Sequence, residues 1–97
     1  MFLAHVVGKV VCTVKDRNLG GRALLLCRPL SALDPQEWED ELLVAMDVVG
    51  TGEGSTVLLC QGSPAMAAAG VASGVDLAAV ALVEHISMGQ ETYSYHK

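Results

Sequence analysis

The chain has 97 residues, of which 52% are hydrophobic and only 18% are charged, whereas a soluble domain usually carries about 25% charged residues. The formal net charge of -5, from 11 acidic and 6 basic residues, repels phosphate backbones and argues against nucleic acid as a partner. Because a small domain with so few charges covers its own surface poorly, we expect it to pack against copies of itself.

The cysteines and the N-terminus indicate a cytoplasmic protein without a membrane partner. Cys12, Cys27 and Cys60 are far apart, lie in apolar runs and form no CxxC pair, a pattern typical of reduced, buried thiols. No basic stretch precedes an apolar segment at the N-terminus, so no signal peptide is predicted. The uncharged run 54–75 could span a bilayer by length, but glycine, proline, serine and glutamine interrupt it.

Two strands are predicted in the first third of the chain. Apolar residues alternate at period two from Ala4 to Val14, which indicates a long, half-buried strand. Residues 15–21 are rich in turn formers and end in two glycines. A second strand is predicted over 22–28, and Pro29 ends it because proline has no N–H to donate to a ladder.

An acidic segment follows the second strand. Asp34 can cap, and Pro35 can begin, at most one or two helical turns, which Glu37 can close as a capping box. Trp38 lies among the acids and either anchors a protein interface, where tryptophan is enriched, or covers the domain's own core. We favour the interface. The acidic residues of the segment are Asp34, Glu37, Glu39, Asp40 and Glu41.

The remaining chain predicts three more strands and one short helix. Strands over 42–49 and 55–61 flank a glycine-rich loop and are expected to pair as a hairpin. A serine and a proline precede an alanine-rich run at 65–69, which indicates a short helix. The last strand is predicted over 77–86.

Five strands and one short helix without an internal repeat favour an all-β fold, a small OB-like barrel that closes its sheet to avoid exposed edges. We expect the barrel domain to span residues 1–86. Residues 87–97 are polar, and we expect a C-terminal tail that is mobile or lies over a neighbouring subunit.

Four stretches of the chain resemble, in order and spacing, the EutN/CcmL family of bacterial microcompartment vertex proteins. They cover most of residues 1–86 and read MFLAHVVGKVVCTVKD, LGGRALLLCRPL, VAMDVVGTGEGSTVLLCQGSPA and VDLAAVALVEHI. The resemblance implies a structural shell subunit that forms pentamers with a narrow axial pore. Such pentamers would cap the vertices of a shell otherwise tiled by hexameric shell proteins, without a catalytic residue, a cofactor or a metal.

The resemblance also suggests site residues. The family's Gly-x-Gly-x-Gly segment falls on the loop 50–54, and three glycines suggest either close backbone approach at a symmetry axis or a merely flexible turn. The residues expected nearest the axis are Gly50, Thr51, Gly52, Glu53 and Gly54. The candidates for the subunit interface are Asp47, Gly62, Ser63, Ala65 and Trp38. Relatives often carry an arginine where this chain has Met66, which puts any arginine contact at that place in doubt.

Other functions are less well supported. An OB-like module for single-stranded nucleic acid or another ligand would need basic grooves and stacking aromatics, but only 4% of the residues are aromatic. An enzyme is not indicated because no catalytic set converges. His5 and His85 could approach each other if their strands were neighbours, but without a third ligand we expect no metal site.

Overall fold

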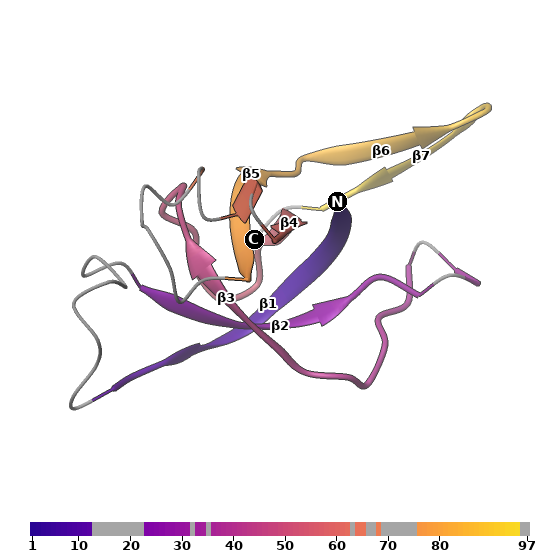
Figure 1. The fold of residues 1–97 in the computed structure, drawn as a ribbon. Helices are drawn as coiled ribbons and strands as arrows, with labels where there is room; N and C mark the ends of the chain where they lie inside the picture. The colour runs from indigo at the N-terminus through magenta and orange to yellow at the C-terminus, as the bar shows by residue number, and fades with distance from the viewer. Residues whose placement is uncertain are drawn as a thin grey trace.

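The computed structural model describes residues 1–12, 23–31, 33–34, 36–62, 64–65, 68 and 76–95. Five of its strands form a closed barrel, and two more form a hairpin that projects from it (Figure 1). No helix in these ranges is both long and apolar enough to cross a bilayer. The barrel strands are β1 (Phe2–Val10), β2 (Leu24–Pro29), β3 (Leu43–Asp47), β4 (Thr56–Gln61) and β5 (Leu77–Leu82), and the hairpin strands are β6 (His85–Met88) and β7 (Glu91–Ser94).

The strands follow one another around the barrel in the order β1-β2-β3-β5-β4, and β4 closes the sheet by pairing with β1. All neighbours are antiparallel except β3 and β5, which run parallel. This is the five-stranded arrangement of an OB-like barrel, in which closure removes the sheet edges. The predicted all-β barrel is therefore confirmed.

The predicted hairpin between the strands at 42–49 and 55–61 is wrong. β5 lies between β3 and β4 and pairs with both of them. The glycine-rich loop therefore crosses one end of the barrel and does not turn back along a neighbouring strand. Two strands joined by a loop need not pair with each other, because a later strand can insert between them. Here β5 inserts between β3 and β4, and its pairing with both completes the barrel.

The single strand predicted over 77–86 is in fact two strands. β5 ends at Leu82, and the backbone N–H of Val83 then donates to the carbonyl of Thr56 at 2.8 Å. β6 begins at His85 and pairs with β7 through a turn at Gly89, whose φ is +61°. Most of the segment predicted as a polar tail, residues 87–97, therefore belongs to a hairpin. Its strands are mostly polar, so apolar and polar residues alternate too weakly to predict them from the sequence.

The barrel interior is filled from alternate positions of all five strands, as the period of a strand requires. A second buried cluster consists of Met46, Cys60, Ala65 and Ala78. Met46, Cys60 and Ala78 each follow or precede an inward-facing residue, so their side chains lie on the outer side of β3, β4 and β5. The predicted helix at 65–69 lies mostly outside the described residues, although Ala65 and Ala68 have helical backbone. The interior cluster consists of Ala4, Val6, Leu25, Cys27, Ala45, Val57, Leu59 and Ala79.

The three cysteines differ in exposure, contrary to the prediction that all are buried. Cys27 and Cys60 are buried, but Cys12 is exposed because β1 ends at Val10 and the alternating file beyond it is not packed. Burial, with a smaller contribution from the Asp47 carboxylate, raises the pKa of the Cys27 thiol to about 11. A thiol that is buried and protonated is a poor nucleophile.

We therefore expect iodoacetamide to label native protein at Cys12 alone and denatured protein at all three cysteines. Intact-mass spectrometry before and after unfolding in urea counts the adducts. Rapid labelling of Cys27 in the native protein would contradict the buried position.

Candidate functional site

The two ends of the barrel differ in structure. β3 begins at one end with Leu43 and finishes at the other with Asp47. The glycine-rich loop, residues 48–55, lies beyond Asp47 and leads into β4. The opposite end, where Leu43 lies, is called the barrel mouth below.

Asp47 organises the glycine-rich loop. Its side chain is almost buried, with 8% of the residue exposed. One carboxylate oxygen, Oδ1, accepts from the N–H groups of Val49 at 3.1 Å and Gly50 at 2.9 Å, and Oδ2 accepts from the N–H of Thr51 at 2.8 Å. Hydrogen bonds to an ionised acceptor are among the stronger ones in proteins. Asp47 therefore holds the first half of the loop in place from within its own subunit.

The second half of the loop is tied to β1. The N–H of Gly54 donates to the carbonyl of Val6 at 2.9 Å, and the N–H of Val6 donates to the carbonyl of Ser55 at 2.8 Å. Gly50 and Gly54 have positive φ angles of 77° and 89°, which favour glycine. These bonds and those of Asp47 fix the backbone of the loop within its own subunit. The close approach of the loop to a symmetry axis stays a prediction.

Trp38 lies in an aromatic stack within its own chain. Its ring stacks on His5 at a centroid distance of 5.2 Å and meets Tyr95 at 5.8 Å with a tilt of 58°. The stack joins β1, the acidic segment and the base of the hairpin. Burial lowers the pKa of His5, which favours the neutral ring there. The role of Trp38 in a subunit interface stays a prediction.

A metal site between His5 and His85 finds no support in this geometry. β1 pairs with β2 and β4, and neither β5 nor β6 is its neighbour. Within the part of the chain that the structure describes, no group of three or more histidine, cysteine or acidic side chains lies close enough together to hold a metal ion.

The remaining interface candidates lie beyond the end of β4. Gly62 is exposed, has a φ of +69°, and its N–H donates to the carbonyl of Asp76 at 3.0 Å. Ala65 is fully buried within one chain, so its side chain has no surface to offer a neighbour. Ser63 and Met66 lie outside the described residues.

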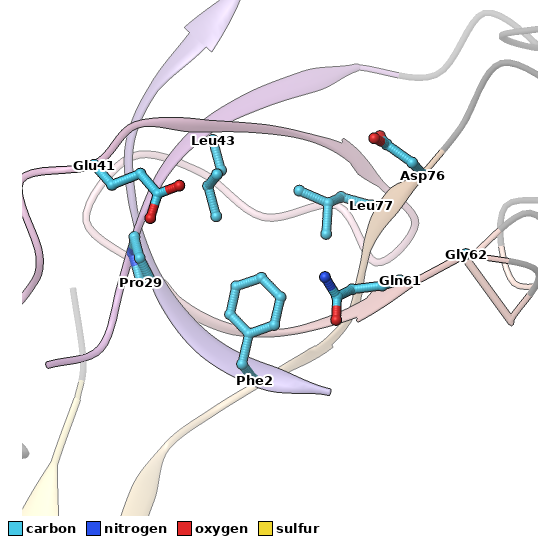
Figure 2. A pocket seen from close by; sticks show the side chains of 8 residues that line it. All are labelled: Phe2, Pro29, Glu41, Leu43, Gln61, Gly62, Asp76 and Leu77. Atoms are coloured by element: carbon cyan, nitrogen blue, oxygen red, sulfur yellow. The ribbon is translucent and has the colours of Figure 1, made fainter. Parts of the chain in front are cut away.

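The sequence analysis missed a pocket at the barrel mouth. It has a volume of about 550 Å³ and draws on the mouth-side end of every barrel strand (Figure 2). Phe2, Pro29, Leu43, Gln61 and Leu77 continue the inward-facing files of the five strands, whereas Gly62 and Asp76 lie just beyond the ends of β4 and β5. Part of the signal was therefore present in the alternation, but none of it lay in a short motif. The pocket is lined by Phe2, Pro29, Glu41, Leu43, Gln61, Gly62, Asp76 and Leu77.

Together these features define a class of small OB-like barrels with a hydrogen-bonded glycine-rich loop across one end and several apolar side chains left on the outer surface. A sequence model of the family described as "Ethanolamine utilisation protein EutN/carboxysome" matches residues 1–84. The chain belongs to this EutN/CcmL family, as the resemblance in its sequence predicted.

Individual relatives are similar over nearly their whole length. The shell vertex protein EutN of Escherichia coli is 37% identical over 99 residues, covering 100% of both chains. The shell vertex protein PduN of Salmonella typhimurium is 41% identical over 93 residues, covering 90% of this chain and 99% of its own. Among solved structures, the GrpN pentameric microcompartment shell protein of Rhodospirillum rubrum superposes with a TM-score of 0.79 at 32% identity, covering 91% of this chain and 99% of that one.

Proposed function

We propose that the protein is a structural vertex subunit of a bacterial microcompartment shell and performs no catalysis. Five copies form a closed ring that caps a corner of the shell in the cytoplasm, flanked by hexameric shell proteins. Similarity over the whole chain to proteins named as shell vertex proteins carries this proposal. A flat hexagonal layer needs five-fold positions to close, and a head-to-tail ring supplies one.

The surface of the isolated chain supports self-association. Leu82 is 59% exposed and Val44 48% exposed, although both belong to barrel strands, where a monomer would normally place polar residues. Leu42 and Val49, at the two ends of β3, are also exposed. Burying such side chains between subunits is favourable because it removes apolar surface from water.

The hairpin supports a further contact between subunits. Residues 87–97 were expected to be mobile or to lie over a neighbouring subunit, and β6 and β7 contain mostly exposed residues, with Met88 at 54%. An isolated two-stranded hairpin is marginally stable in water. We therefore propose that the barrel, with β1 to β5, is the ring-forming unit and that the hairpin packs on the adjacent subunit.

The glycine-rich loop is proposed to surround the axial pore. Residues 50–54 lie at one end of the barrel, and Asp47 of the same subunit accepts the backbone N–H groups of Gly50 and Thr51. Glycines at the tip allow several copies to converge closely.

Native mass spectrometry tests the ring. Five chains of 10.1 kDa give an expected mass of about 50 kDa.

The variant Gly52→Trp tests the loop. Gly52 does not have a positive φ, unlike Gly50 and Gly54, so a side chain there fits the backbone of the single subunit. We expect Gly52→Trp to weaken the ring or block its axial opening and Gln36→Leu, an exposed change in the acidic segment, to do neither. A monomeric wild type would overturn the ring, and a Gly52→Trp ring with an unchanged opening would overturn the position of the loop.

A further inference from the structure

The proposed function assigns no role to the pocket at the barrel mouth, although Gly62, one of its lining residues, is a candidate for the subunit interface. Its volume of about 550 Å³ lies within the range of sites that enclose a ligand or a large side chain. It lies at the end of the barrel opposite the glycine-rich loop, because Leu43 lines it and Asp47 begins the loop.

The floor of the pocket is apolar. The Phe2 ring points into it from β1, and the Leu43 and Leu77 side chains point toward it from β3 and β5 (Figure 2). Phe2 and Leu77 also pack against the interior cluster, so the core supports them. All three are only half-buried, and an apolar occupant would remove their remaining surface from water.

The rim of the pocket is acidic on both sides. Glu41 lies on one side and Asp76 on the other, on the same side as Leu77 and Gln61 (Figure 2). The bond from the N–H of Gly62 to the carbonyl of Asp76 fixes the backbone there. Within the described ranges neither carboxylate has an ion-pair partner. The site thus combines an apolar floor with two uncompensated negative charges, which complement a cation on an apolar stem.

The approach to the pocket is negative as well. Glu41 belongs to the acidic segment, whose other carboxylates are all exposed, and one of them, Asp40, pairs with Arg28 at 3.7 Å. An extended field of one sign attracts a partner surface of the opposite sign over several contacts. A small free amine would use only the two rim charges, so the wider pattern favours a basic protein surface.

The geometry points to a docking site in which the barrel mouth receives an arginine side chain from a neighbouring shell protein, an inference that rests on the proposed function. The apolar stem of arginine can lie along Leu43 and Leu77, while its planar guanidinium can stack on the Phe2 ring and donate to a rim carboxylate, Glu41 or Asp76. Lysine would offer a point charge without the planar stacking surface.

The test uses the assembled full-length protein with isotope-labelled leucine methyl groups. The probe is the peptide acetyl-Leu-Arg-Leu-amide, and its control carries neutral citrulline in place of arginine. In about 150 mM salt, where distant charges are screened, we expect the arginine peptide to shift the NMR signals of Leu43 and Leu77. The citrulline peptide should bind about tenfold more weakly, since it loses the charge-assisted bonds.

Two double variants separate the pocket from its surroundings. Glu41→Gln with Asp76→Asn should weaken peptide binding by about tenfold or more. Glu37→Gln with Glu39→Gln removes the same charge from exposed positions outside the pocket and should weaken it by less than about threefold. Both should keep the native mass of the wild type.

Equal binding of the citrulline peptide would overturn the docking site. So would the absence of any shift at Leu43 and Leu77, which would mean that an adjacent subunit already covers the mouth. Tighter binding of free 2-phenylethylammonium than of the arginine peptide would also overturn it. The last result would indicate a small-molecule site. A wild-type ring that ignores the peptide overturns only this inference, whereas a wild type that forms no ring overturns the proposed function.

Discussion

Replacing Asp47 with alanine is expected to lower the free energy of unfolding by about 3 kcal/mol, because three backbone N–H groups lose a charged acceptor inside a nearly buried site. The loss is smaller than three separate bonds would suggest, since part of the loop can rotate toward water. Asp47→Asn should have an intermediate effect, because the amide keeps one accepting oxygen for Val49 and Gly50 and loses the bond to Thr51.

Urea unfolding at one fixed protomer concentration measures this effect, since the stability of an oligomer depends on concentration. Asp34→Ala is the matched control. Its carboxylate also accepts a backbone bond, from the N–H of Gln36 at 2.9 Å, but on an exposed turn. We expect it to cost less than about 1 kcal/mol. If the unfolding midpoint of Asp47→Ala equalled that of the wild type, the account of how the loop is held would be wrong.

Leu59→Ala should be at least as damaging, with an expected cost of about 3–4 kcal/mol. Leu59 is fully buried in the barrel interior, and it pairs with Ala79 on the neighbouring strand β5. Ala4 and Ala45 also belong to the interior cluster. Such small side chains cannot extend into the space that a shortened Leu59 would leave, so the cavity would persist.

Denaturant unfolding of Leu59→Ala, again at fixed protomer concentration, tests this prediction. Leu33→Ala is the control, because Leu33 is 96% exposed and should change stability by less than about 0.5 kcal/mol. A cost below about 1 kcal/mol for Leu59→Ala would show that the barrel relaxes around the deletion and that its interior is not rigidly packed.

The sequence was most informative about strands, burial and family. Alternation at period two places Ala4 and Val6 inside the barrel, because successive side chains of a strand face opposite sides wherever that strand pairs. The second strand ends at Pro29, one residue later than predicted, because Pro29 still pairs with Ala4 of β1. The order of four short stretches was enough to indicate the EutN/CcmL family, and with it the closed barrel.

Only the tertiary structure decided which strands are neighbours and what meets at the two ends of the barrel. The pairing of β3 with β5 depends on where the sheet closes, and the break after Leu82 and the exposure of Cys12 depend on where β5 and β1 stop pairing. No local pattern encodes these limits. The hydrogen bonds from the glycine-rich loop to Asp47 and the pocket at the barrel mouth also became visible only in the tertiary structure. The pocket joins Phe2 with Leu77, which are distant in sequence and meet because five strand ends converge on one opening.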